Sequence, residues 1–175
     1  MTTVGEDLAD AAWGLYCLAF DELRVAAAQR HVMHRHEFDE VMTDKRVTKF
    51  IVEDGEIRGL ATRTNDLEAV PLISPDYFQA RYPRHFASGR IFYVGFMAVH
   101  PDYHGTGVFV DMVTDMSADA AAVGGIMAMD FCRITNKQYQ LPQAALRVGR
   151  THNSELTATL LDEQSYWAYE FPAVS

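Results

Sequence analysis

The sequence predicts an α/β (α+β) fold in which a mixed central β-sheet is flanked by helices. Three observations favour this class: apolar residues recur at helical spacing near the start, a strand hairpin follows, and the second half alternates strand and helix. A length of 175 residues suits one domain, 1–175, with a single sizeable core. Because 49% of the residues are apolar and 22% are charged, we expect a globular chain.

Two helices are expected before the sheet begins. The first starts near Leu8 and continues toward Val25, because apolar residues recur there every three or four positions. These positions are Leu8, Ala11, Ala12, Leu15, Leu18 and Ala19. The second, shorter helix covers HEFDEVM, residues 36–42, with Phe38, Val41 and Met42 on its inner side.

Residues 46–64 predict two strands, because Asp54-Gly55 between two strand-like runs is a strong hairpin signal. The next segment, an insertion at about 65–90, holds three prolines and is expected to be irregular. Its apolar residues could line an acyl or substrate pocket, cover a sheet edge or form a dimer contact. They are Val70, Leu72, Ile73, Tyr77, Phe78 and Tyr82.

The second half begins with IFYVGFMAV, residues 91–99, which carries no charge and predicts a strand buried on both faces. Gly95 inside this run indicates a bulge or a close backbone approach. A helix from Val108 to Val123, a buried strand over 124–132 and a short helix over 140–148 should follow. The segments 155–161 and 165–171 are expected to close the chain as a hairpin.

The most informative stretch is HPDYHGTGVFVDMV, residues 100–113, where a buried strand turns through two glycines into a helix. The first turn of a helix has backbone N–H groups without intrahelical partners, and the helix dipole adds partial positive charge there. Glycines allow positive φ and close approach of a ligand, so a pyrophosphate fits this arrangement. Two glycines alone also suit an ordinary tight turn.

The phrase V-H-P-D-Y-x-G-x-G-V, residues 99–108, resembles motif A of the GNAT superfamily, the Gcn5-related N-acyltransferases. The expected element order matches that family over most of the chain. The resemblance implies an acyl-CoA N-acyltransferase-like sheet, a splay between its two central strands, and acetyl-CoA or another acyl-CoA as co-substrate. It implies that the pantetheine meets Met97, Ala98 and Val99, and that Asn136 lies on the cofactor side. The residues implied for the pyrophosphate are His104, Gly105, Thr106, Gly107, Val108 and Phe109.

Three positions depart from the pattern of that family. His104 stands where arginine is common, and Phe109 stands where a small residue is usual. A phenyl ring at position 109 either turns into the core or crowds the phosphates. Residues 1–4 are too short to supply the family's first strand convincingly.

Acyl transfer to an amine needs a group that accepts the amine's proton and, usually, an acid for the departing thiolate. Asp130 is the preferred base, because a carboxylate within an otherwise apolar strand is costly unless it is paired or functional. The alternative places Asp130 at the strand end, paired with Arg133 or another arginine. The family's usual tyrosine is not found, and Tyr139 is the nearest candidate acid, with a surface or packing role as the alternative.

Other reactive side chains favour structural roles. His100 precedes a turn proline, and Cys132 suits a buried, inert thiol. HVMHRH, which contains His31, His34 and His36, fits no standard metal spacing and predicts a solvated segment between helices, so no metal is expected. Cys17 and Cys132 form no disulfide framework, which favours a reducing cytoplasm.

A net charge of −9 argues against nucleic acid and against an anionic membrane surface as partners. The chain shows neither a signal-peptide pattern nor a membrane-length apolar run. Together with these exclusions, the resemblance to the GNAT superfamily implies a cytoplasmic N-acyltransferase acting on a small-molecule primary amine, and a homodimer stays open. Residues 65–89 also loosely resemble a segment of acyl-homoserine-lactone and N-acyl amino acid synthases, which implies a longer acyl-CoA or acyl carrier protein donor. A non-catalytic acyl-CoA-binding or regulatory domain, or a fold that no longer binds CoA, are the remaining alternatives.

Overall fold

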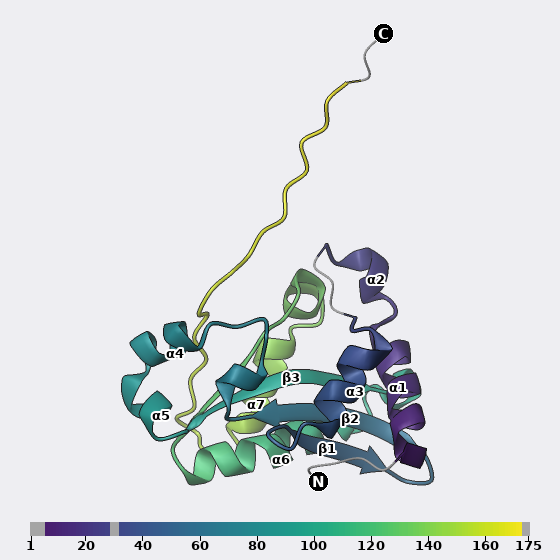
Figure 1. Ribbon diagram of the computed structural model, residues 1–175. Helices are drawn as coiled ribbons and strands as arrows, with labels where there is room; N and C mark the ends of the chain where they lie inside the picture. The colour runs from purple at the N-terminus through teal and green to yellow at the C-terminus, as the bar shows by residue number, and fades with distance from the viewer. Residues whose placement is uncertain (1–5, 29–31, 173–175) are drawn as a thin grey trace.

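A four-stranded sheet with helices on both faces makes up the body of the molecule (Figure 1). The computed structural model describes residues 6–28 and 32–172. The strands are β1 (Thr48–Glu53), β2 (Ile57–Thr64), β3 (Ile91–Val99) and β4 (Ile126–Met129). The α-helices are α1 (Glu6–Phe20), α2 (Leu23–Ala26), α3 (Arg35–Thr43), α4 (Pro75–Arg81), α5 (Pro83–Ala87), α6 (Val108–Ala122) and α7 (Leu141–Gly149). Three short helical turns complete the list: η1 (Leu67–Ala69), η2 (Pro101–Tyr103) and η3 (Ile134–Gln138).

The sheet is mixed, as the sequence predicts. Its strand order is β1-β2-β3-β4, with antiparallel pairing between the first three strands and parallel pairing between β3 and β4. The hairpin predicted at Asp54-Gly55 is confirmed, and Gly55 has the positive φ of 75° that this turn requires. The parallel step from β3 to β4 is made through α6, the usual connection for a parallel pair.

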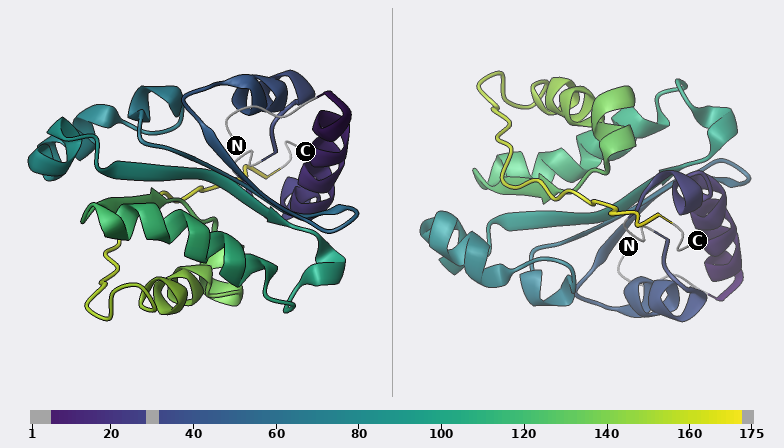
Figure 2. Two further views of the ribbon diagram at one scale, coloured as in Figure 1. Left: turned by 90° about the horizontal axis from the view of Figure 1, so that it is seen from below. Right: turned by 90° about the horizontal axis from the view of Figure 1, so that it is seen from above.

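The two faces of the sheet are covered by different helices (Figure 2). Side chains of successive strand residues alternate between the faces, so each strand contributes to two cores. On one face, α1 and α3 pack over a cluster of aromatic residues that includes Tyr16, Phe38 and Phe96, while α4 and α5 extend this layer over β3 and β4. On the other face, α6 packs through Val108, Met112 and Met116. The helix expected over 108–123 is thereby confirmed, although it ends one residue earlier, at Ala122, and Val123 is exposed.

Strand β3 contains a bulge at Gly95, as expected. On β2, Thr62 pairs with Phe96 and Arg63 pairs with Val94, which leaves Gly95 without a partner residue. The backbone N–H of Phe96 donates a hydrogen bond of 3.3 Å to the Thr62 hydroxyl, which supports the bulge. A Cβ atom at position 95 would lie only 2.8 Å from that hydroxyl oxygen. Only glycine therefore fits here without displacement of Thr62.

The pairing of β3 with β4 ends at this bulge. Its last pair is Val94 with Met129, and β3 then continues to Val99 with β2 as its sole strand neighbour among the described residues. The edge of residues 95–99 that faces away from β2 is therefore open. This is the divergence of the two central strands that the sequence comparison implied.

The helix α6 is fixed on the sheet by a buried arginine. Arg63 of β2 donates hydrogen bonds to the Met116 carbonyl oxygen and, at 2.6 Å, to the Asp119 carboxylate. Its guanidinium lies over the rings of Phe50 and Phe92, at 5.0 and 4.9 Å from their centroids. A buried charge is tolerated because it is paired and stacked, and these contacts hold α6 in register with the strands.

Two helical expectations need correction. The first helix ends at Phe20, and the chain resumes as α2 only after a turn. The segment 65–89, expected to be irregular, folds into η1, α4 and α5. Ser74 caps α4 by accepting a hydrogen bond of 3.3 Å from the Tyr77 N–H, and prolines occupy the first positions of α4 and α5.

The expectation of a terminal hairpin was wrong. Residues 155–161 and 165–171 form no strand in the described structure, and the chain after Leu161 runs away from the body (Figure 1). The strand expected over 124–132 is also shorter, ending at Met129. The first strand discussed for residues 1–4 lies outside the described residues. No helix within the described ranges is long and apolar enough to cross a membrane.

The bulge generates a test of stability. Gly95→Ala should lower the free energy of unfolding by about 1–3 kcal/mol, because the new methyl group overpacks against Thr62. Urea denaturation measures the change. Gly14→Ala is the matched control, since a Cβ there meets nothing within 4 Å and helix α1 should gain up to about 1 kcal/mol. Equal stability of the Gly95→Ala and native chains would contradict the role given to this bulge.

Candidate active site

The glycine loop between β3 and α6 has the geometry of an anion site. Gly105 and Gly107 have φ values of 80° and 103°, and Gly107 is the N-cap residue of α6. The N–H groups in the first turn of any helix have no intrahelical acceptor. Here no side chain caps the helix, so no side chain at the N-cap accepts from them either. These are the properties that allow a helix start to hold phosphate oxygens.

The loop also has the space that a pyrophosphate needs. A Cβ built at Gly105 or Gly107 meets nothing within 4 Å, so the backbone is open on that side. The Thr106 hydroxyl donates to the Tyr103 carbonyl oxygen at 2.7 Å and braces the turn. Phe109 is half-buried in the first turn of α6, one turn before the buried Met112 and Val113. The residues present therefore fit the group.

The position of the loop follows from packing beneath α6. Gly59 of β2 lies under the first turn of this helix, where a Cβ would come within 2.6 Å of the Val108 side chain. Gly59 also pairs with Val99, the last residue of β3. Gly59 of β2 is thus the point where the start of α6 and the end of β3 come together. His104, in the extended conformation that precedes Gly105, is exposed there.

The residues implied for the pantetheine lie on the open part of β3. Met97, Ala98 and Val99 pair with Ala61, Leu60 and Gly59 of β2, and no described strand pairs with their other edge. The structure therefore brings the implied pantetheine residues and the glycine loop into one continuous stretch, from the bulge to the start of α6. Asn136 is half-buried in η3, a π-helical turn of the kind that often marks functional sites.

Asp130 directly follows the end of β4 and is exposed, so the expectation of a carboxylate inside a buried strand was wrong. The predicted strand ran three residues too far, which placed Asp130 within it. Its partner is a tyrosine rather than Arg133: the Tyr93 hydroxyl donates a hydrogen bond of 2.8 Å to the Asp130 carboxylate.

Tyr93 is the residue of the candidate site that the sequence did not indicate. It belongs to β3 two residues before the bulge, and its ring is buried. Burial first, and then the Asp130 carboxylate, raise the pKa of the Tyr93 hydroxyl well above its usual range. The hydroxyl therefore remains protonated and orients the carboxylate at the point where β3 and β4 separate. Its only signal in the sequence was a hydroxyl within an otherwise apolar strand.

Tyr139, the candidate acid, does not join this pair. Its ring is half exposed and its hydroxyl lies 3.4 Å from the Glu22 carboxylate, in the turn between α1 and α2. The contact connects the segment after β4 to the end of α1. Asp130 and Tyr139 therefore have separate partners, and the structure offers no hydrogen bond between them.

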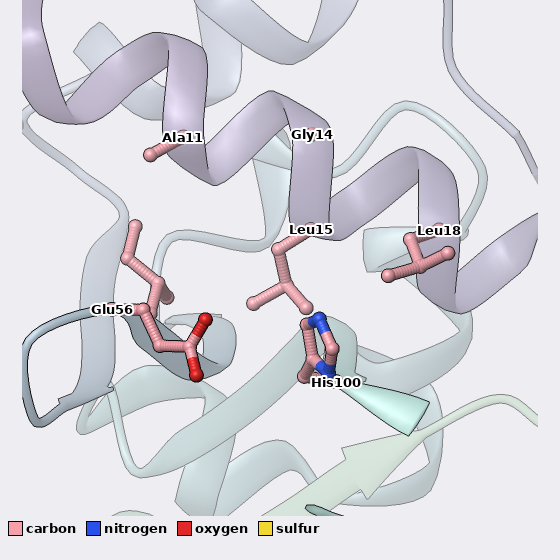
Figure 3. A pocket seen from close by; sticks show the side chains of 7 residues that line it. Ala11, Gly14, Leu15, Leu18, Glu56 and His100 are labelled. Carbon is pink, nitrogen blue, oxygen red and sulfur yellow. The ribbon is translucent and has the colours of Figure 1, made fainter. Parts of the chain in front are cut away.

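A hollow lies beside the end of β3, between α1 and the start of β2 (Figure 3). Its floor is mainly apolar, and Glu56 and His100 face it from below the helix (Figure 3). The full lining is Ala11, Gly14, Leu15, Leu18, Glu56, Ile57 and His100. The His100 ring accepts a hydrogen bond of 3.3 Å from the Asp102 N–H, at the turn that precedes the glycine loop.

The Glu56 carboxylate ties the hollow to the glycine loop. It accepts a hydrogen bond of 2.5 Å from the Tyr103 hydroxyl, and this bond is the main cause that raises the pKa of Tyr103 above its usual value. The guanidinium of Arg58 stacks over the Tyr103 ring, at 4.7 Å from its centroid, and pairs with Asp54 at 2.6 Å. The turn that leads into the loop is thus braced from β2.

The histidine and cysteine candidates have ordinary environments. His34 is the N-cap residue of α3 and its ring stacks on His36 at 5.9 Å, whereas His31 lies outside the described residues. Within the ranges that the structure describes, no group of three His, Cys, Asp or Glu residues could hold a metal ion. Cys17 and Cys132 are free, half-buried thiols, and the sulfur of Cys132 lies 3.5 Å from the Thr135 hydroxyl.

A mixed sheet whose central strands separate at a bulge, followed by a glycine loop and a helix, is the GNAT acyl-CoA N-acyltransferase fold. The resemblance seen in the sequence is thus confirmed at the level of the fold. No protein-family model matches the sequence, and no curated protein matches it significantly. Similarity is found instead among solved structures.

An aminoglycoside acetyltransferase from an uncultured soil metagenomic sample, in complex with trehalose, covers 95% of this chain and 93% of its own. The TM-score is 0.54 at 11% identity. The structure of that acetyltransferase with sisomicin has the same coverage, with a TM-score of 0.53 at 12% identity. AAC(6')-Iy, in complex with the bisubstrate analog CoA-S-monomethyl-acetylneamine, covers 93% of this chain and 95% of its own, with a TM-score of 0.52 at 14% identity.

The Tyr93–Asp130 hydrogen bond can be tested by substitution. Tyr93→Phe should lower the free energy of unfolding by about 1–2 kcal/mol, because a buried hydroxyl loses a charged acceptor. Tyr77→Phe is the matched control: its exposed hydroxyl donates to the Leu161 carbonyl oxygen, so the loss should stay below about 0.5 kcal/mol. Denaturant unfolding of both variants gives the comparison, and equal losses would contradict a special role for Tyr93.

Proposed function

We propose that this chain is an N-acyltransferase that transfers an acetyl or other acyl group from a CoA thioester to the primary amine of a small molecule. The single observation that carries the proposal is the open edge of β3 after the Gly95 bulge, which leads directly into an uncapped glycine loop. This edge offers unpaired backbone groups to an extended ligand arm, and the loop offers N–H groups to an anion. Together they suit the two chemically different parts of CoA.

The residues can be assigned roles in this reaction. The acyl-CoA supplies a thioester carbon that is activated toward amines. Residues 104–109 would hold the pyrophosphate, Met97 to Val99 would position the pantetheine arm by backbone hydrogen bonds, and Asn136 of η3 would contact the cofactor. Asp130, oriented by Tyr93, would accept the proton that the amine loses as the C–N bond forms and the C–S bond breaks. Tyr139 remains a candidate for returning a proton to the thiolate.

The acceptor class is supported by the structural neighbours. The two soil acetyltransferase complexes contain a disaccharide and an aminoglycoside, and the AAC(6')-Iy complex contains a bisubstrate analog that joins CoA to an acetylneamine. A small polar amine is the acceptor proposed for this chain. The acidic net charge also favours a cationic acceptor, such as a protonated amine.

A longer acyl donor finds less support. Most of the apolar residues of 65–89 pack against β3 and β4 instead of facing open space: Phe78 is buried there, with Val70, Ile73 and Tyr82 around it. They cover one face of the sheet. A short acyl group such as acetyl is therefore the donor we favour.

A non-catalytic acyl-CoA-binding domain is the second candidate. The observation that favours it is the Tyr139 hydroxyl, which lies against Glu22 and away from Asp130. Such a domain would bind CoA at the same loop but release no thiol when amines are added. Binding and turnover must therefore be measured separately.

Binding is tested at the glycine loop. Acetyl-CoA at about one hundred times its dissociation constant should stabilise the chain by about 2.7 kcal/mol, seen as a rise in the melting temperature. Gly107→Ala should abolish most of this rise, because the loop can no longer keep its left-handed conformation around an anion. Gly124→Ala is the matched control, since this glycine also has a positive φ, 57°, with open space around it, but lies after α6.

The binding test has clear contrary outcomes. If acetyl-CoA, free CoA and a long-chain acyl-CoA all leave the native melting temperature unchanged, the proposed function is wrong. If Gly107→Ala and Gly124→Ala lose the same part of the rise, the cofactor site lies elsewhere.

Turnover is tested at Asp130. With a panel of small amines and acetyl-CoA, Asp130→Asn should reduce thiol release about 10²–10⁴-fold and leave the CoA-induced stabilisation nearly intact. Asp115→Asn, an exposed carboxylate on α6, is the control and should keep native rates. Native rates in Asp130→Asn would remove this residue from the mechanism. CoA binding without thiol release by the native chain, whatever the amine, would instead favour the non-catalytic domain.

A further inference from the structure

The proposed function gives no role to the hollow beside the end of β3 (Figure 3). Helix α1 lies on one side of it, and the start of β2 and the residue after β3 lie on the other. Its volume is about 230 Å³. Pockets for drug-sized ligands have volumes of roughly 300–1,000 Å³, so this hollow suits a smaller organic molecule.

Apolar side chains form most of the surface of the hollow. Leu15 and Ile57 are buried beneath it, and Leu18 is half exposed, at 50%. Gly14 adds space on the side of α1, since a Cβ built there meets nothing within 4 Å. Covering this surface with a compact apolar group would remove both from water, which is favourable.

Glu56 gives the hollow a negative charge. Its Oε1 atom accepts the hydrogen bond of 2.5 Å from the Tyr103 hydroxyl, and no hydrogen bond to Oε2 is found among the described residues. Arg58, two residues further along β2, pairs with the Asp54 carboxylate at 2.6 Å instead. One oxygen of Glu56 is therefore available to a cationic ligand.

His100 adds an aromatic ring to the hollow opposite α1 (Figure 3). Its Nδ1 atom accepts the hydrogen bond from the Asp102 N–H, and the Asp102 carboxylate lies 4.0 Å from the same nitrogen. The lining thus presents a carboxylate, Glu56, and an aromatic ring that has a second carboxylate beside it. Both features favour a cation over an anion.

The hollow is separate from the proposed reaction centre. His100 follows Tyr93 by seven residues, which is roughly 20 Å along an extended strand. Between them, on the same face of β3, Phe96 is buried against Phe38 with 6.0 Å between the ring centroids. A molecule held in the hollow is therefore not placed to react beside Asp130.

We propose that this hollow is a second ligand site, which binds a protonated amine with a compact apolar body. The ammonium group would pair with the Glu56 carboxylate. The apolar body would lie on Leu15, Leu18 and Ile57, beside the His100 ring. An anion would be repelled by Glu56, and a neutral molecule would form no ion pair there.

This second site does not depend on acyl transfer. Its ligand needs neither CoA nor the Tyr93–Asp130 pair, so its failure would leave the proposed function untouched. The converse also holds.

The probe for the site is N,N-dimethylphenethylamine, which is protonated at neutral pH. A tertiary amine forms no stable amide, so its binding cannot be confused with use as an acyl acceptor. Titration followed by the amide resonances in NMR should show one site with a dissociation constant of about 1 mM and the largest shifts at Leu15, Leu18 and Ile57. Phenethyl alcohol, which is neutral, should bind about fivefold more weakly, because it makes no ion pair with Glu56.

Substitutions locate the site. Glu56→Gln keeps an acceptor for the Tyr103 hydroxyl but removes the charge, and it should weaken amine binding about fivefold. Glu53→Gln is the matched control, because it removes the same charge from an exposed residue of the same hairpin outside the lining; it should keep the native affinity. Gly14→Leu should abolish binding, because the new side chain fills the hollow from α1. Asp130→Asn should leave the affinity unchanged.

Three results would each overturn this second site. They are the absence of amine binding by the native chain, equal affinity for the amine and phenethyl alcohol, and equal affinities of Glu56→Gln and Glu53→Gln for the amine. Shifts confined to Tyr93 and Asp130 would place the amine at the reaction centre, and this outcome would also contradict the proposal.

Discussion

The bulge at Gly95 is the constraint on which the candidate site depends. A continuous parallel pair of β3 and β4 would use the backbone groups of both strands along their full length. β3 inserts one unpaired residue at position 95 opposite β2, and its pairing with β4 ends one residue earlier, at Val94, so the rest of β3 keeps an open edge. The Thr62 hydroxyl stabilises the bulge, because it accepts a hydrogen bond from the Phe96 N–H and leaves room only for glycine at position 95.

The buried Arg63 on the neighbouring strand β2 connects the Gly95 bulge to the position of helix α6. Arg63 follows Thr62 on β2 and pairs with Val94, the residue before the bulge. Its guanidinium binds α6 through the Met116 carbonyl oxygen and the Asp119 carboxylate. The start of the same helix rests on Gly59, four residues earlier on β2. A single strand thus sets both the opening between β3 and β4 and the position of the glycine loop. The two halves of the candidate site are coupled through β2.

Much of the fold could be predicted because its signals are local. The Asp54-Gly55 turn, the uncharged run with Gly95 and the apolar face of α6 each depend on a few neighbouring residues, and all three are confirmed. The cap of α4, Ser74 followed by Pro75, is equally local, although the segment 65–90 was expected to be irregular. Elements whose signals lie within a few neighbouring residues could therefore be predicted from the sequence.

The failures concern contacts between residues far apart in the sequence. Tyr93 and Asp130 meet only because Tyr93 pairs with Ala128 across the parallel strands, and no spacing in the sequence reports that register. The terminal residues have the alternation of a strand, but alternation does not say which sheet the strand joins. Both errors have one physical origin: a strand's pattern determines its faces, whereas its neighbour is chosen by the rest of the fold.

The composition of the glycine loop sharpens what the proposed function requires. From His100 to Val113 the only side chains that can carry positive charge are two histidines, and one of them, His100, is held at the turn by the Asp102 N–H. Arg58, the nearest arginine on β2 for which a loop contact is seen, stacks on Tyr103 and pairs with Asp54. In the proposed enzyme, the attraction for a pyrophosphate would therefore come mainly from backbone N–H groups and the dipole of α6. The fold fixes the positions of these donors. The geometry of the phosphate site would therefore depend on how α6 packs on Gly59 and Arg63.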